Sequence, residues 1–280
     1  MSEPLIMRAR VQAPLKEVFQ ALTEPAALRA WFAEYAEVEL PGRFEFWGRY
    51  TLEGDAPHQR LLHADDRSLS FAWLLDGVET TTEIGLDEEA GGATVITLSQ
   101  SHFDFNDVIT GASIRGVLQT FWSLAIANLI DHVEGREITG RIDYTSADLG
   151  GEVSIAAPAG EVFDSLIDGE KVSRWFGYPI AIEPYVGGRY AVGGFDNPHA
   201  AKIVELEPGH RISIDWGPGG TTVWEVAETG GVTRFTFRQR EFDAARPPYA
   251  SWTGSVCGVA ELRRYHELAD WQPIWIHDEH

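Results

Sequence analysis

The chain has 280 residues, of which 44% are hydrophobic and 11% aromatic, a composition typical of globular domains and not of disordered chains. It carries 43 acidic and 22 basic side chains, a formal net charge of −21, so nucleic acids and anionic membranes would be repelled at long range and are not expected as partners. The single cysteine, Cys257, excludes an intrachain disulfide and a thiolate metal cluster.

Targeting and membrane segments are not expected. The residues Met1–Pro4 lack the basic and apolar blocks of a signal peptide. No apolar run approaches the length of a membrane-spanning helix. We therefore expect a soluble protein located in the cytoplasm.

The sequence contains an internal repeat. The run Ala13–Leu22 returns as Ala157–Leu166, and a Trp-Phe pair follows each run, beginning at Trp31 and at Trp175. The offset is 144 residues, and 8 of the 20 positions from 13 to 32 are identical in the second copy. A solenoid repeats about every 20–50 residues, so this longer period indicates a duplicated domain.

The repeat sets the predicted domain organisation. We predict one domain over residues 1–140 and a second over 148–280, with a glycine-containing connector between them. Two domains of about 100–150 residues each also agree with the length of the chain. A feature that both copies share then belongs to the fold, and a feature of one copy is a candidate for a specific function.

The first repeat opens with an alternating strand, and a helix follows at Pro14, where proline is tolerated because its missing N–H is not needed. Leu69, Phe71 and Trp73 alternate with small residues, as in a strand with one covered face. The last segment has no proline and a wide apolar stripe, which predicts a long helix. The predicted elements are a strand over 5–11, helices over 14–22 and 28–32, strands over 44–47, 69–73, 80–86 and 94–100, and a helix over 111–134.

The second repeat has the same order of features. Its predicted elements are a strand over 152–155, helices over 158–166 and 171–176, strands over 187–190, 212–216 and 233–242, and a helix over 249–269. Each half is thus predicted as an α+β domain, a curved antiparallel sheet wrapped around a long C-terminal helix, with two short helices after the first strand. A sheet that wraps one helix tends to leave a cavity suited to a small ligand.

Several of these features together resemble a known family. Both copies contain Ala-Pro-x-x-x-Val-Phe, the Trp-Phe pair, a Gly-Arg-aromatic run, an apolar strand ending in tryptophan and a closing helix. This order is similar to that of the activator of heat-shock-protein-90 ATPase homologue (AHSA-type) domains of the SRPBCC superfamily, also called START-like or Bet v 1-like helix-grip. The resemblance covers about 125 residues of each half. It implies a sheet of about seven antiparallel strands and a hydrophobic pocket between sheet and helix.

The resemblance implies function only broadly. The superfamily includes co-chaperones, lipid and hormone binders and polyketide cyclases, and a fold with many uses does not name one. Many members carry Thr-His after the last strand's apolar run, whereas this chain has Gln100 and Gln239 at the matching histidine positions. A role of that histidine would be absent here, or would pass to His102 in the first repeat.

The aromatic residues and His102 are the candidate ligand contacts. The duplicated tryptophans are expected in the core, some at the pocket rim, whereas unmatched tryptophans are candidates for stacking on a planar ligand. His102 precedes Asp104 and has general acid–base potential, although the second repeat has Glu241 there and the shared Phe-Asp that follows indicates a structural turn. The candidate pocket residues are Trp31, Trp47, Trp73, His102, Phe121, Trp175, Trp216, Trp224 and Trp252.

Three functions follow as hypotheses. The first is non-catalytic binding of a hydrophobic or aromatic small molecule in one or both cavities. The second is an Hsp90-type co-chaperone or client-interaction protein, and the third is a cyclase-like enzyme that uses His102, Asp104 or Glu241. The sequence has no HExxH, no Cys/His metal spacing, no phosphate-binding glycine loop and no nucleophile elbow, so we expect neither a metal nor a cofactor.

Overall fold

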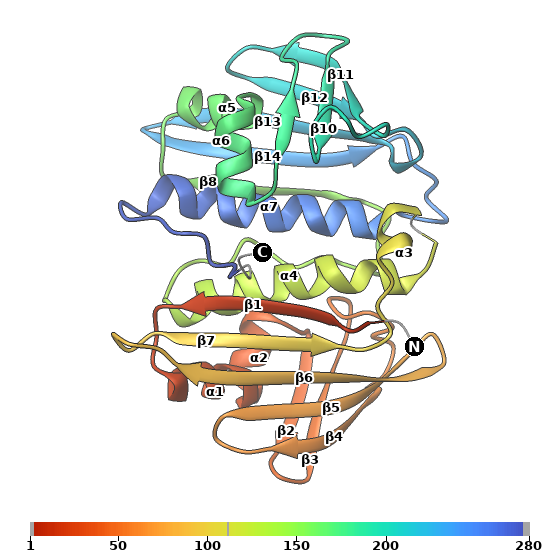
Figure 1. The fold of residues 1–280 in the computed structure, drawn as a ribbon, viewed down its shortest axis with the longest axis vertical. Coiled ribbons are helices and arrows are strands. Elements are labelled where there is room, and N and C mark those ends of the chain that lie inside the picture. Colours follow the sequence, from red (N-terminus) through yellow and green to blue (C-terminus); the bar gives the residue numbers. More distant parts are fainter. Residues whose placement is uncertain (1–2, 111, 277–280) are drawn as a thin grey trace. The chain divides into compact units, whose positions relative to one another are not determined.

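The computed structural model describes residues 3–110 and 112–276, and the chain divides into two compact units (Figure 1). The first unit comprises Met1–Thr145 and the segment that begins at Ile274, and the second comprises Ser146–Pro273. No helix among the described residues is long and apolar enough to span a membrane.

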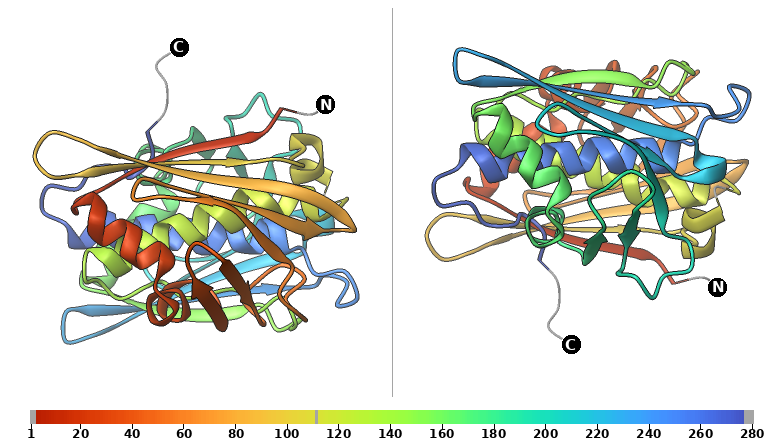
Figure 2. Two further views of the ribbon diagram at one scale, coloured as in Figure 1. Left: turned by 90° about the horizontal axis from the view of Figure 1, so that it is seen from below. Right: turned by 90° about the horizontal axis from the view of Figure 1, so that it is seen from above.

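The first unit carries two sheets and a long helix. A five-stranded antiparallel sheet has the order β1-β7-β6-β5-β4, and β2 and β3 form a separate hairpin. Seen from below in Figure 2, the strands of the larger sheet pass in front of α4. The elements are β1 (Leu5–Val11), α1 (Leu15–Thr23), α2 (Pro25–Trp31), β2 (Tyr35–Glu39), β3 (Arg43–Trp47), β4 (Gln59–Ala64), β5 (Ser68–Leu75), β6 (Val78–Glu88), β7 (Thr94–Gln100), α3 (Phe105–Thr110) and α4 (Ile114–Val133).

The second unit has one continuous antiparallel sheet of seven strands, in the order β8-β14-β13-β12-β11-β10-β9. Its elements are β8 (Gly150–Ile155), α5 (Ala159–Ile167), α6 (Gly169–Phe176), β9 (Ile180–Ile182), β10 (Arg189–Val192), β11 (Ala201–Glu207), β12 (Arg211–Asp215), η1 (Gly217–Gly219), β13 (Thr221–Thr229), β14 (Val232–Arg240) and α7 (Tyr249–Glu267). Both units therefore have the predicted α+β class, with antiparallel strands and a long closing helix, and this prediction is confirmed.

The structure changes the prediction for the long helix of the first unit. A single helix was predicted over 111–134, but a short helix, α3, precedes α4, which begins only at Ile114. Ser113 caps α4, because its side chain accepts a hydrogen bond from the N–H of Arg115 at 3.2 Å. Gly111, the predicted first residue, lies outside the described residues.

The end of the described chain belongs to the first unit. The N–H of Arg10 donates to the carbonyl of Ile274 at 2.8 Å, and the N–H of Ile276 donates to the carbonyl of Arg8 at 2.9 Å. These bonds add a short extended segment to the free edge of β1. Residues 274–276, which we predicted in the second domain, therefore pair with the edge strand of the first.

Candidate functional site

A cluster of aromatic rings fills the space between the strands and α4 of the first unit. The ring centroids of Phe46 and Trp73 lie 5.2 Å apart, those of Trp73 and Phe121 5.7 Å, and Phe32 stacks on Trp122 at 5.8 Å. Trp73 is 0% exposed, and its indole N–H has no hydrogen-bond partner among the described residues. The members of this aromatic cluster are Phe32, Phe44, Phe46, Phe71, Trp73, Phe121 and Trp122.

A buried glutamine adjoins the cluster. The Gln100 Oε1 accepts hydrogen bonds from the Thr82 hydroxyl at 2.6 Å and from the Trp122 indole N–H at 3.0 Å. In the second unit the Gln239 Oε1 accepts one from the Thr222 hydroxyl at 2.5 Å. Glutamine at the position of the family's histidine is thus paired with threonine in both copies, which indicates a part of the fold.

A small cavity remains at the side of the aromatic cluster, where α2 and α4 meet the segment that follows α4. Its volume is about 20 Å³, which is room for about one water molecule. The lining residues are Trp31, Phe32, Tyr50, Phe121, Leu124, Ala125, Asn128, Arg141, Ile142 and Tyr144.

Residues 136–145, which we call the cover segment, form one side of this cavity through Arg141, Ile142 and Tyr144. The Arg141 guanidinium donates to the carbonyl oxygens of Arg29 at 2.8 Å and Ala33 at 3.1 Å, and lies 4.0 Å from the centre of the Tyr50 ring. Among the described residues it makes no ion pair with a carboxylate. Burial lowers the pKa of Arg141 from its ordinary value. Because carbonyl oxygens and a ring do not neutralise the Arg141 guanidinium, its positive charge can still attract an acceptor in the cavity.

Asn128 fixes the cover segment from the side of α4. Its Nδ2 donates to the carbonyl of Gly140 at 2.7 Å, and its Oδ1 accepts from the N–H of Thr139 at 3.2 Å. The Tyr144 N–H donates to the carbonyl of Arg49 at 2.8 Å. The cover is therefore held by a few polar contacts above apolar walls.

The first pair of duplicated tryptophans has the same structural role in both units. The Trp31 indole donates to the carbonyl of Ala21 at 3.0 Å, and the Trp175 indole donates to that of Ser165 at 2.7 Å. Each bond ties the second short helix to the first. Trp31 also lines the cavity of the first unit, and its role in ligand binding stays a prediction.

The remaining candidate tryptophans of the second unit lie along a series of ring contacts. Tyr190 contacts Trp216 at 5.9 Å and Trp224 at 6.1 Å, whereas Trp252 lies 5.2 Å from Phe237. The Trp216 indole donates to the Thr222 hydroxyl at 2.8 Å, but the buried Trp224 N–H has no hydrogen-bond partner in the part of the chain that the structure describes. A role of these residues in ligand binding stays a prediction.

Trp47 and His102 lie apart from the aromatic cluster. Successive residues of β3 face opposite sides, so Phe46 points into the cluster and Trp47 points away, where it stacks on Tyr35 at 5.5 Å. His102 has φ 64° and its counterpart Glu241 has φ 59°. The same left-handed turn therefore follows the last strand of both units, as expected for a structural turn.

Most residues of the site were not among the candidates, and they include Trp122, Asn128, Arg141 and Tyr144. Trp122 and Asn128 lie on α4, and Trp122 could have been found because it is the neighbour of Phe121 in the predicted apolar helix. Arg141 and Tyr144 had no such signal, because their position depends on how the connector folds back. Within residues 3–110 and 112–276, no group of three His, Cys, Asp or Glu side chains is placed to hold a metal ion.

The sequence matches the model of one protein family. The sequence model described as "Activator of Hsp90 ATPase homolog 1-like protein" matches residues 12–133 and 156–257. No curated protein matches the chain.

Solved structures give weaker likenesses. CalU16 from Micromonospora echinospora is 26% identical, over 48% of this chain and 76% of its own, with a TM-score of 0.36. DynU16, a protein in the dynemicin biosynthetic locus, is 16% identical over 95% of this chain and 100% of its own, with a TM-score of 0.41. The di-domain ARO/CYC BexL from the BE-7585A biosynthetic pathway is 19% identical over 97% and 100%, with a TM-score of 0.39. With TM-scores below 0.5, these likenesses contribute nothing to the functional argument.

Proposed function

Because this chain belongs to the Activator of Hsp90 ATPase homolog 1-like family, whose sequence model matches both repeats, we propose that its first unit binds an apolar or aromatic small molecule between the sheet and α4. The observation that carries the proposal is the aromatic-walled cavity beneath the cover segment. Binding sites of this kind combine apolar walls with a few polar groups that orient the ligand.

The polar groups of the cavity indicate how the ligand would be oriented. Arg141 and Asn128 line it together with rings and aliphatic side chains. Arg141 offers N–H donors only, so the ligand would direct an oxygen or nitrogen acceptor towards it. Because the cavity holds about one water molecule, a larger ligand would need the space that a displacement of residues 136–145 provides.

Native mass spectrometry of the full chain, followed by denaturation, tests whether a molecule is retained. We expect one equivalent of an apolar or aromatic compound, and Ala125→Leu should remove it, because the longer side chain fills the cavity. The thermal unfolding of this variant checks that the unit is still folded. A folded Ala125→Leu protein that retains the compound would place binding elsewhere.

A fluorescent probe tests the cover segment even if the purified protein carries no compound. We expect 1-anilinonaphthalene-8-sulfonate to associate and dissociate faster with Arg141→Gln than with the original chain, since the substitution removes the bonds to Arg29 and Ala33. Arg67→Gln, at an exposed and long ion pair with Glu88, is the matched control and should leave both rates unchanged. Equal rates in all three proteins, measured by stopped-flow fluorescence, would exclude the cover as the entrance.

Chaperone or client binding is the second candidate, because the second unit exposes aromatic side chains. Phe176, Tyr178 and Phe195 are 37%, 54% and 39% exposed. Tyr178 lies beside Gly193, whose N–H donates to the carbonyl of Pro179 at 2.7 Å, so these residues share one region of the surface. Exposed aromatic side chains of this kind are common at protein interfaces.

Biolayer interferometry against a purified Hsp90-type chaperone tests this candidate. If the aromatic surface docks the chaperone, Tyr178→Ser with Phe195→Ser should weaken binding by about tenfold or more, since aromatic residues dominate interface energies. Val78→Ser, at an exposed apolar residue of the first unit, is the control. No binding by the original chain would rule this candidate out and leave the small-molecule proposal unaffected.

A further inference from the structure

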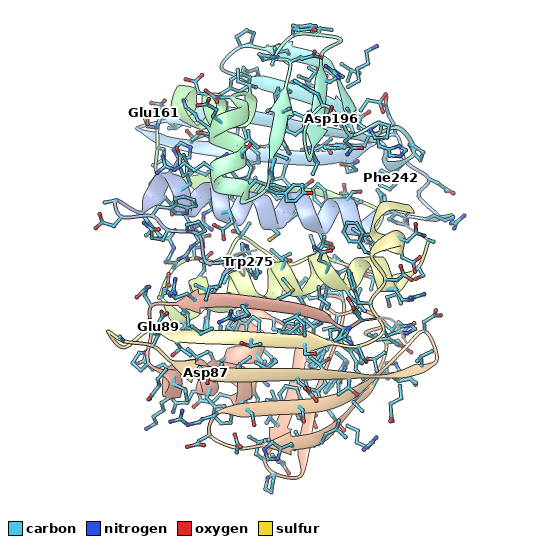
Figure 3. All side chains as sticks on the ribbon, in the orientation of Figure 1. Asp87, Glu89, Glu161, Asp196, Phe242 and Trp275 are labelled. Carbon is cyan, nitrogen blue, oxygen red and sulfur yellow. The ribbon has the colours of Figure 1, made fainter. Side chains whose placement is uncertain are left out.

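The second unit has a cleft outside the space between its sheet and α7. This cleft of about 680 Å³ is formed by α5, α6, the end of α7 and residues 268–272. Its volume falls in the range of small-molecule sites. Figure 3 shows Glu161, one of its lining residues, on α5. The lining residues used below are Glu161, Lys171, Arg174, Tyr265, His266, Asp270 and Trp271.

Arg174 is the main donor group of the cleft. Its guanidinium lies 5.7 Å from the centre of the Tyr265 ring and 5.9 Å from that of Trp271. No hydrogen bond or ion pair to it is made by the described part of the chain. Two rings therefore orient a planar cation whose five N–H donors remain available, and its fork matches the two oxygens of a carboxylate.

Trp271 adds a second donor and an apolar wall. Its indole N–H is shielded from solvent and has no hydrogen-bond partner within the described residues. Its ring meets that of Tyr265 edge to face at 5.2 Å. A buried donor without an acceptor is costly, so a ligand that moves the atoms shielding this N–H and supplies an acceptor would be favoured.

His266 forms the back of the cleft. Its Nε2 lies 3.1 Å from the Ser165 hydroxyl, which itself donates to the carbonyl of Glu161 at 3.1 Å. Because that hydroxyl hydrogen is already used, the neutral imidazole donates from Nε2 and its Nδ1 is an acceptor. Ser165 is buried, so the pair positions the imidazole and does not offer an accessible nucleophile.

The charges of the lining define the ligand class. Lys171 and Arg174 contribute two positive charges, and Glu161 and Asp270 contribute two negative charges, so a polyanion would meet repulsion. A single carboxylate matches the guanidinium, and an aromatic body matches the rings of Tyr265 and Trp271. We propose that this cleft binds an aromatic carboxylate.

Isothermal titration calorimetry of the full chain with 2-naphthoate tests the proposal, with neutral 2-naphthamide as the matched ligand. We expect the affinity for the amide to be lower than that for the carboxylate by a factor of about ten or more. Arg174→Gln should lower the affinity for 2-naphthoate by a similar factor. The affinity of Arg174→Lys for 2-naphthoate should lie between those of the original chain and Arg174→Gln, because lysine keeps the positive charge but lacks the paired N–H donors of the guanidinium. Arg240→Gln, an exposed arginine on β14, has the same charge change and should bind 2-naphthoate unchanged.

The indole N–H signals in a ¹⁵N–¹H spectrum locate the bound probe. The Trp271 signal, assigned by its loss in Trp271→Phe, should move downfield with 2-naphthoate as its N–H gains an acceptor. Unchanged affinity in Arg174→Gln, or a Trp271 signal that does not move at saturation, would overturn the proposal. Binding that Ala125→Leu abolishes and Arg174→Gln does not would assign the probe to the cavity of the first unit instead.

Discussion

Replacing Trp73 by alanine should destabilise the first unit by about 3–5 kcal/mol, the usual cost of removing a large buried aromatic side chain. Trp73 is fully buried, and its ring contacts Phe46, Phe121 and Trp122. Its removal leaves a cavity at the centre of the aromatic cluster, where surrounding rings can relax only in part. Urea unfolding followed by far-ultraviolet circular dichroism measures the loss. A midpoint and slope equal to those of the original chain would contradict the packing described above.

Phenylalanine substitutions separate packing from hydrogen bonding. Trp73→Phe loses ring volume but no hydrogen bond, because the indole N–H has no partner within residues 3–110 and 112–276. Trp122→Phe also loses the bond to Gln100 at 3.0 Å and should cost about 1 kcal/mol more. If Trp73→Phe were the more costly of the two in protein freed of small molecules, the indole N–H of Trp73 would have an acceptor within the chain.

Gly116→Ala should also destabilise the first unit strongly, although alanine is the better helix former. A Cβ at Gly116 would overlap the carbonyl of Asp107 and lie 2.7 Å from the backbone nitrogen of Val108. Backbone cannot move aside as a flexible side chain can, so we expect a net loss of about 1–3 kcal/mol or a displaced α3. Thermal unfolding by calorimetry measures the change.

Gly160→Ala is the matched control for this substitution. Gly160 lies in the first turn of α5, and a Cβ there would meet no atom within 4 Å. Alanine should therefore stabilise the second unit, by up to about 1 kcal/mol. Equal effects of the two substitutions would show that α3 does not lie against Gly116.

Local patterns explain which parts of the fold could be predicted. Leu69, Phe71 and Trp73 alternate because one face of β5 is buried, and this period of two is visible in the sequence. β4 was not predicted, because a register shift between Leu61 and His63 interrupts its alternation. β9 has only three residues, which is too short for any period to be recognised.

The candidate site was predictable only where side chains belong to regular elements. Trp31, Trp73 and Phe121 lie on predicted elements and reach the cavity or the cluster beside it. Trp47 was a candidate because it has no counterpart in the second repeat, although it has the opposite strand parity to Phe46. The position of Arg141 depends on tertiary contacts with the carbonyls of α2 and its end, and no spacing in the sequence encodes them.

The pairing of residues 274–276 with β1 has a consequence for the order in which the chain acquires its structure on the ribosome. All of the second unit is synthesised after α4 and before Ile274 leaves the exit tunnel. The first unit can collapse early, but the outer edge of β1 stays open until the second unit has been made. An open strand edge is a template for pairing with another chain. This nascent protein therefore passes through a stage in which the edge of its earliest strand is open to pairing with another chain, and the closing segment ends that stage.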